Sequence, residues 1–175
     1  MNGTTTSNAR RSLAGGRARA LLLACCLFLL GIPNAHAQAL GYGIGGPAAV
    51  SGFFGSLTGF HAAGGGEVLV GRRAGGGAEL GMLGNVSSVL QVVSVNGVVH
   101  ILPVPLAHGV SPFITGGYSR LSSGEGAFAA WNVAAGVDIW EKNHAGLRID
   151  VRDHVRPDSR GTVHYLTFRI GVVVK

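Results

Sequence analysis

Cysteine is almost absent from this sequence. Its 175 residues contain two, Cys25 and Cys26, next to each other near the N-terminus. Both fall in a segment with the features of a cleaved leader, so the rest of the chain has no thiol. This excludes a disulfide framework and a cysteine-ligated zinc site as sources of stability.

Charged residues are also scarce, at 13% of the chain, and the formal net charge of +6 is misleading. Four of the fourteen Lys and Arg residues lie in the first 37 residues, which contain no Asp or Glu. The remaining chain has ten basic and eight acidic residues, a net charge of +2, and its basic residues form no stripe. We therefore expect no nucleic-acid partner.

No apolar run is long enough for a membrane-spanning helix, which needs about 20 residues. The longest, residues 20–32, has thirteen residues; it follows four arginines and precedes the small-x-small sequence of residues 35–37. These are the parts of a secretory signal peptide, so we predict cleavage between Ala37 and Gln38. A lipoprotein box ending at Cys25 is the alternative, but it would be cut inside the apolar run.

Compact motifs for catalysis or ligand binding are missing as well. The seven histidines include no His-x-His or His-x₃-His pair. Asp153, His154 and Ser159 could be combined as an acyl-transfer set, but no Gly-x-Ser-x-Gly motif is present. The glycine triplets at 64–66 and 75–77 lack the strand–turn–helix context of a phosphate loop. We expect no metal site, no cofactor and no enzymatic activity.

What the sequence does contain is alternation. Residues 147–155 alternate between apolar and polar side chains, and residues 131–139 do so more weakly. Successive side chains of a strand point to opposite faces, so each segment has one apolar and one polar face. Residues 141–143 between them are polar and few enough for a hairpin. In the second segment the polar face consists of Arg148, Asp150, Arg152 and His154.

Two kinds of protein fit this alternation. In a soluble barrel or sandwich the apolar face is the core and the charged face meets solvent. In a transmembrane barrel the apolar face meets lipid and the charged face lines a narrow interior. Periodicity alone does not separate them. The soluble alternative would be a secreted or periplasmic protein that binds a small apolar ligand.

Several segments resemble the small outer-membrane β-barrel family, the opacity-protein-like and OmpA-like eight-stranded barrels. Residues 136–140, 146–148 and 151–155 resemble its last hairpin, and residues 112–118 resemble a middle strand. The resemblance covers about residues 48–175. It implies an all-β, antiparallel up-and-down barrel of eight strands, exported to the outer membrane of a Gram-negative-type envelope. A structural or surface-interaction role would follow, with outer-membrane lipid and the barrel-assembly machinery as partners.

We divide the chain into a signal peptide (1–37), an N-terminal extension (38–47) and a barrel domain (48–175). The dipeptide Asn96-Gly97 is a strong hairpin signal and would split one strand in two, giving nine. Bacterial single-chain barrels have even strand counts, so we prefer one long strand. The expected strands are residues 48–55, 60–71, 77–83, 89–102, 110–118, 129–140, 147–155 and 162–174, with polar loops at 119–126 and 156–161.

The closing strand matches most of the assembly signal that the resemblance implies. Arg169 supplies the polar residue, Gly171 the glycine two positions later and Val174 a terminal apolar residue. Lys175 departs from the signal, because these proteins typically end on an aromatic residue. The candidates for the interfacial aromatic rings are Tyr118, Trp131, Trp140, Tyr165 and a few Phe residues.

Charges on the inward face would meet in an interior too narrow for a water column. Buried charges need partners and hydrogen bonds, so we predict a structural salt-bridge network, with conduction or ligand binding as the alternative. Ser94, Asn96 and His100 would face the same interior. The network would comprise the acids Glu67, Glu79, Asp138 and Asp150 and the bases Arg148, Arg152 and Arg169.

Overall fold

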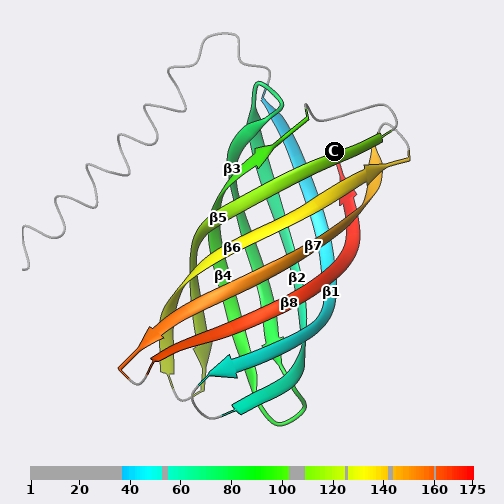
Figure 1. Ribbon diagram of the computed structural model, residues 1–175. Coiled ribbons are helices and arrows are strands. Elements are labelled where there is room, and N and C mark those ends of the chain that lie inside the picture. The colour runs from blue at the N-terminus through cyan, green and yellow to red at the C-terminus, as the bar shows by residue number, and fades with distance from the viewer. Residues whose placement is uncertain (1–36, 53–54, 103–108, 125, 142–143, 160) are drawn as a thin grey trace, which may run out of the picture. The chain divides into compact units, whose positions relative to one another are not determined.

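The computed structural model describes residues 37–52, 55–102, 109–124, 126–141, 144–159 and 161–175 (Figure 1). No helix within these residues is long and apolar enough to cross a membrane. The predicted cleavage after Ala37 lies at the start of the described residues and stays a prediction. The strands are β1 (Gln38–Gly52), β2 (Gly55–Val70), β3 (Ala74–Gly84), β4 (Val89–His100), β5 (Gly109–Ser123), β6 (Gly126–Trp140), β7 (Ala145–Asp158) and β8 (Gly161–Val174).

The eight strands form one closed barrel in which each strand pairs antiparallel with its neighbours in sequence. β8 pairs with β1 to complete the circle, from Gly41 opposite Val174 to Ser51 opposite His164. Closure leaves no free edge strand, and a sheet in lipid requires this because each unpaired backbone group costs several kcal/mol there. The predicted eight-stranded up-and-down barrel is confirmed.

β4 shows why these residues form strands. Its side chains alternate along the whole length, with Val92, Ser94 and Asn96 buried and their neighbours exposed. Asn96 pairs with Gly77 of β3 and Gly117 of β5, so Asn96-Gly97 lies inside one strand and not in a turn. The choice of one long strand is therefore confirmed, although β4 ends at His100, two residues before the predicted end.

The predicted N-terminal extension at 38–47 is wrong, because these residues form most of β1. Leu40, Tyr42 and Ile44 point inward there, and the positions between them are glycines. Apart from Gln38 at its start, no polar residue marks either face of this segment, so an alternation of apolar with polar residues does not detect it. The barrel thus begins at Gln38 and not at residue 48.

Two predicted polar loops are also largely strand. β5 continues to Ser123 and β7 to Asp158, although loops were predicted at 119–126 and 156–161. Ser119 and Leu121 are fully buried on the inner face of β5. In a barrel whose interior is polar, serines mark an inward face as readily as a loop, and this explains the error.

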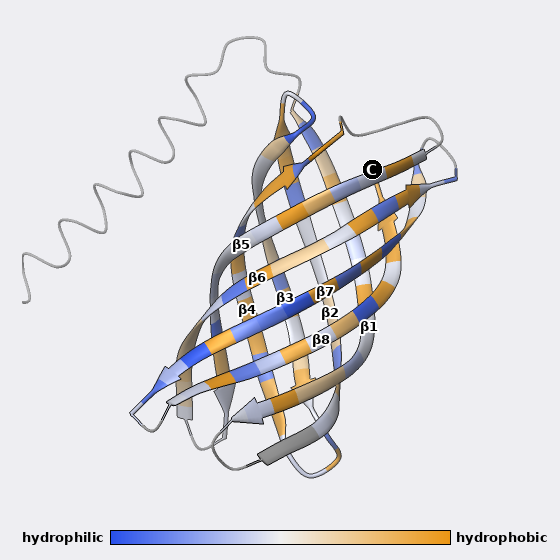
Figure 2. Ribbon diagram, viewed as in Figure 1, coloured by the Kyte–Doolittle hydropathy of each residue, from blue (hydrophilic) through white to orange (hydrophobic). Residues whose placement is uncertain are grey.

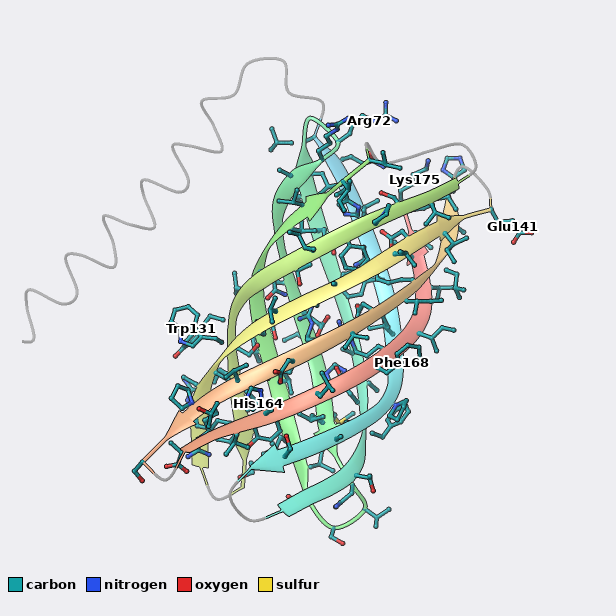
Figure 3. The ribbon with its side chains drawn as sticks, in the orientation of Figure 1. Arg72, Trp131, Glu141, His164, Phe168 and Lys175 are labelled. Atoms are coloured by element: carbon teal, nitrogen blue, oxygen red, sulfur yellow. The ribbon has the colours of Figure 1, made fainter. Side chains whose placement is uncertain are left out.

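The barrel has two distinct ends. The first residue of β1 and the last of β8 lie at one end, here called the terminal end, with the connections 71–73, 101–108 and 141–144. Figure 3 shows Arg72, Glu141 and Lys175 together at this end. The far end carries the other four connections, 53–54, 85–88, 124–125 and 159–160, which contain two to four residues each.

Candidate functional site

The outside of the barrel is apolar. Leu80 and Val95 are each 65% exposed, and exposed Val, Leu, Ile, Phe and Met side chains recur on every strand from β2 to β8 (Figure 2). Trp131 and Phe168 point away from the barrel (Figure 3). Soluble monomers seldom expose contiguous apolar patches above a few hundred Å². The surface is therefore that of a transmembrane barrel, and the soluble alternative does not fit it.

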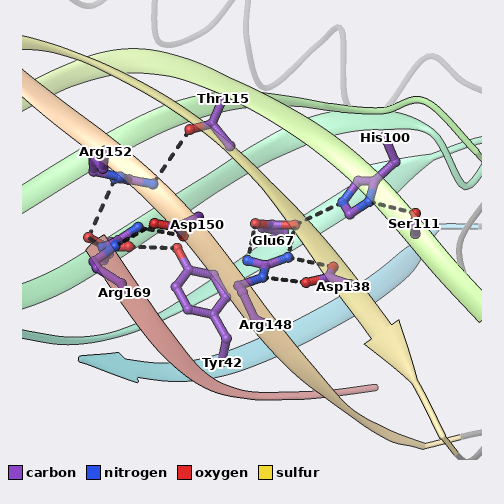
Figure 4. A network of polar contacts seen from close by, with 11 residues as sticks. Tyr42, Glu67, His100, Ser111, Thr115, Asp138, Arg148, Asp150, Arg152 and Arg169 are labelled. Carbon is purple, nitrogen blue, oxygen red and sulfur yellow. Dashed lines mark hydrogen bonds and ion pairs between the residues drawn. The ribbon is translucent and has the colours of Figure 1, made fainter. Parts of the chain in front are cut away.

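The inside of the barrel holds the charges. All seven residues predicted for the inward network are at most 4% exposed. They come from β2, β3, β6, β7 and β8, and the structure brings them together in two linked groups (Figure 4). His100, also predicted inward, joins them through Nε2, which lies 3.3 Å from Glu67 Oε2. Ser94 and Asn96 are buried farther along the barrel.

The first group is centred on Arg148. Its Nε and Nη2 donate to the two oxygens of Asp138 at 2.7 and 2.8 Å, and Nη1 donates to Glu67 at 2.6 Å. The rings of Tyr42 and Phe113 each lie 4.4 Å from the guanidinium carbon. Arg148 is thus held by two carboxylates and by two aromatic rings, which favour a desolvated cation. It is the most fully satisfied charge in the interior.

The second group is centred on Glu79. Arg169 donates to Glu79 at 2.8 Å and makes a two-pronged contact with Asp150 at 2.7 and 2.8 Å. The Tyr42 hydroxyl also donates to Glu79, at 3.1 Å. Arg152 is held more loosely, at 3.4 Å from Glu79, and its Nε has no hydrogen-bond partner among the described residues. The sequence left open which acid faces Arg152, and the structure gives Glu79.

Glycine makes room for the aromatic rings that support these groups. Gly65 of β2 pairs with Tyr42 on one side and Glu79 on the other, so the Tyr42 side chain crosses over it to reach Glu79. A β-carbon at Gly65 would lie 2.6 Å from Oη of Tyr42. Gly136 is placed in the same way, between Phe113 and Asp150. Aromatic side chains packed over strand glycines are a known device for fixing register.

Gly65→Ala is expected to lower the free energy of unfolding by about 1–3 kcal/mol, the usual cost of overpacking a filled core. The added methyl group displaces the Tyr42 ring and weakens its contacts with Glu79 and Arg148. Urea unfolding of the refolded barrel in lipid vesicles measures the loss. Gly43→Ala is the matched control, because nothing lies within 4 Å of a β-carbon there. Equal effects of the two substitutions would contradict this account.

A third polar layer lies toward the far end and is centred on Ser119. Its hydroxyl is 2.8 Å from Ser94 Oγ, 2.8 Å from Asn132 Nδ2 and 3.0 Å from His154 Nδ1. The His61 and His154 rings lie beside each other with centroids 6.2 Å apart. The sequence did not identify Ser119, which was assigned to a loop. The signal that could have found it is the alternation of residues 117–121, with Ser119 and Leu121 in phase.

The acyl-transfer combination is not assembled. His154 is fully buried inside, whereas Asp153, on the opposite face of the strand, contacts His164 at 2.7 Å. Ser159 is hydrogen-bonded to its neighbour Asp158. In the part of the chain that the structure describes, no group of three or more His, Cys, Asp or Glu could hold a metal ion.

Apolar clusters lie at both ends of the polar interior. The terminal-end cluster includes Leu69, Val98, Trp140 and Val173, and the far-end cluster includes Leu83, Val92, Leu121, Ala130 and Tyr165. Trp140 and Tyr165 point inward and are 2% and 8% exposed, so their assignment to the interfacial rings is wrong. Tyr118 and Trp131 do lie outside, in an edge-to-face pair with centroids 5.7 Å apart.

The last residue belongs to the terminal end. Lys175 Nζ lies 5.4 Å from the centre of the Trp140 ring, in cation–π range. Partial desolvation, with a smaller contribution from the positive charge of Arg72, lowers the pKa of the Lys175 ammonium below its ordinary value. Lys175 therefore packs against the barrel end and does not extend freely from it.

No protein-family model matches the chain, and no curated protein matches it. Solved structures do. Neisserial surface protein A is 14% identical with a TM-score of 0.62, over 79% of this chain and 98% of that one. The N-terminal β-barrel domain of Pseudomonas aeruginosa OprF is 11% identical with a TM-score of 0.57, over 79% and 98%. A de novo designed transmembrane β-barrel is 13% identical with a TM-score of 0.54, over 81% and 97%. The chain has the fold of the small eight-stranded outer-membrane barrels that it resembles in sequence.

Proposed function

We propose that this protein is a non-enzymatic structural β-barrel of the outer membrane whose interior is closed to solutes. The observation that carries the proposal is the order of layers inside the barrel. The three polar layers lie between the terminal-end and far-end apolar clusters, and the outer surface is apolar. Such an arrangement stabilises a barrel in lipid, and its side chains fill the cross-section of the barrel at the polar layers.

Closure of the interior follows from how it is filled. Eight-stranded barrels are just wide enough for side chains to fill. Here Arg148, Arg152 and Arg169 are among the largest fully buried side chains, and each contacts an acid from another strand. Opening a water path would separate these pairs and expose both apolar clusters. A structural role therefore suits the interior better than conduction.

The placement in the envelope follows from the even strand count. The first residue of β1 and the last residue of β8 lie at one end, and we place this end in the periplasm, from which an exported chain inserts. The far end then faces outward, where its connections of two to four residues offer little surface for a binding partner. This favours a structural role over surface interaction. Outer-membrane lipid and the barrel-assembly machinery are the partners we propose.

Expression of the full chain with its leader tests the location. After a carbonate wash, the protein is expected in the outer-membrane fraction, resistant to extraction. Periplasmic proteins of the same cells serve as the internal control, because they must appear in the wash. Recovery of the barrel with those proteins would contradict the proposal.

Planar-bilayer recording tests closure. The refolded barrel is expected to give no discrete conductance steps, because buried side chains fill its cross-section at the polar layers between the two apolar clusters. A general porin reconstituted at the same protein-to-lipid ratio serves as the positive control. Uniform, reproducible steps that scale with the amount of this protein would show a pore and overturn the structural reading.

A further inference from the structure

Strands β2 and β3 separate at the far end of the barrel. Their pairing stops where Phe60 lies opposite Gly84, yet β2 begins five residues earlier, at Gly55. Residues 55–59 pair with β1, and the described strand pairings give them no partner on the side of β3. The barrel wall is therefore shorter at the β3–β4 turn than at the neighbouring β1–β2 hairpin.

A hollow on the inner side opens at this low point. It has a volume of about 230 Å³. Its inward-facing lining is apolar and comes from β1, β3, β4 and β8, and Tyr165 forms the wall across the lumen. The polar residues at its rim are Thr58 of β2 and, in the β3–β4 turn, Asn85 and Ser88. Asn85 Oδ1 already accepts the backbone N–H groups of Ser87 and Ser88. The apolar residues of the lining are Ala48, Val50, Leu83, Leu90 and Tyr165.

A second hollow lies on the outer side of the same wall. It is lined by Phe60, Met82, Val86 and Val89, whose side chains are 50% or more exposed on the surface that meets lipid. The two hollows have four lining residues in common, so only the chain at this point of the wall separates them. The shared residues are Gly59, Leu83, Gly84 and Asn85.

We propose that the inner hollow is a binding site for one acyl chain of a membrane lipid, which enters sideways from the outer hollow. The inference rests on the transmembrane placement proposed above. Lipid is the medium that covers the outer hollow, and the inner hollow lies directly behind it, where β2 and β3 stop pairing. An apolar cavity gains nothing from water, which needs two to four polar partners, whereas an acyl chain matches its lining. The turn donors are already satisfied, so the site needs no polar ligand group.

Quenching of tryptophan by phospholipids with brominated acyl chains tests the site, because the chain holds its own controls. Trp131 faces lipid, whereas the Trp140 side chain is 2% exposed and packs in the terminal-end cluster. Three single-tryptophan barrels are compared in vesicles: one with Trp131, one with Trp140, and one with Tyr165→Trp as its sole tryptophan. If Tyr165→Trp does not fold, as judged by its circular dichroism, Leu90→Trp replaces it as the reporter.

The reporter is expected to lose at least half the fraction of fluorescence that Trp131 loses, although it points inward, while Trp140 is quenched several-fold less. Filling the hollow with Ala48→Phe should reduce quenching of the reporter at least two-fold and leave quenching of Trp131 unchanged.

Reporter quenching as weak as that of Trp140, or unaffected by Ala48→Phe, would overturn the proposal. So would strong quenching by aqueous iodide alone, which would mean a water-filled mouth. Absence of quenching at Trp131 would instead refute the transmembrane placement itself.

Discussion

Arg148→Met should lower the free energy of unfolding in lipid vesicles by about 3–5 kcal/mol, the usual cost of removing one partner from a buried ion pair. The substitution leaves Glu67 and Asp138 buried without the cation that contacts both at 2.6–2.8 Å. Methionine has a similar length and is apolar, so the loss reports the missing charge more than a cavity. Urea titration followed by fluorescence measures it.

Three further variants are compared with Arg148→Met. Arg152→Met should cost less than Arg148→Met, because the contacts of Arg152 with Glu79 and Thr115 are 3.4 and 3.5 Å long. Arg120→Met should change stability little, since Arg120 lies exposed on the outer face of β5. Adding Glu67→Gln to Arg148→Met should restore part of the loss, which a double-mutant cycle quantifies. Equal small effects at 148 and 120 would show that the interior charges do not depend on one another.

Val151→Arg should cost about 2–4 kcal/mol in a bilayer, the range for arginine on the lipid face at the midplane. Val151 is 44% exposed and lies near the middle of β7, opposite Ala135 and Phe168. Val110→Arg, an outward position at the start of β5, is the matched control and should cost about 0–1 kcal/mol because it lies near the interface.

The difference between these two positions is the informative quantity. Both valines are similarly exposed, so burial within the protein does not distinguish them. Unfolding of each variant is compared in vesicles of the same lipid. Similar costs at residues 151 and 110 would mean that depth in a membrane is not what the outer surface experiences.

The sequence predicted the parts of this barrel in which polar and apolar residues alternate. The faces of β7, and of β6 apart from Trp140, were predicted correctly, since charges mark the inner face of β7. β1 was missed over its first ten residues because its outward positions are Ala, Gly or Pro and its inward positions are mostly apolar. The end of β5 was missed because Ser119, which looks like a loop residue, faces the interior. The end of β7 was missed because Pro157 and Asp158 are typical of turns, although both pair with β8. In a barrel with a polar interior and an apolar exterior, alternation thus fails to identify a strand wherever the inward-facing residues are not polar.

The residues of the candidate site could likewise be predicted only in part from the sequence. Which residues face inward follows from a period of two, and the seven predicted network residues all lie inside. Which of them meet depends on strand stagger, which one sequence does not encode locally, so the partner of Arg152 stayed open. The supporting groups were missed for another reason. Tyr42 and Gly65 act as a pair across two strands, and neither is unusual alone.

The ion pairs across the interior join segments that are far apart in the chain. Arg148 and Glu67 are separated by 81 residues, and Arg169 and Glu79 by 90. These contacts form only after β2 and β3 have met β7 and β8, when nearly the whole chain is in place. Until then Glu67, Glu79 and Arg152 remain without these partners, whereas Arg148 can already contact Asp138 and Arg169 can contact Asp150 on the neighbouring strand. An open sheet would expose the unpaired charges to lipid. Insertion should therefore be slow and all-or-none, with ring closure as the step that commits the chain.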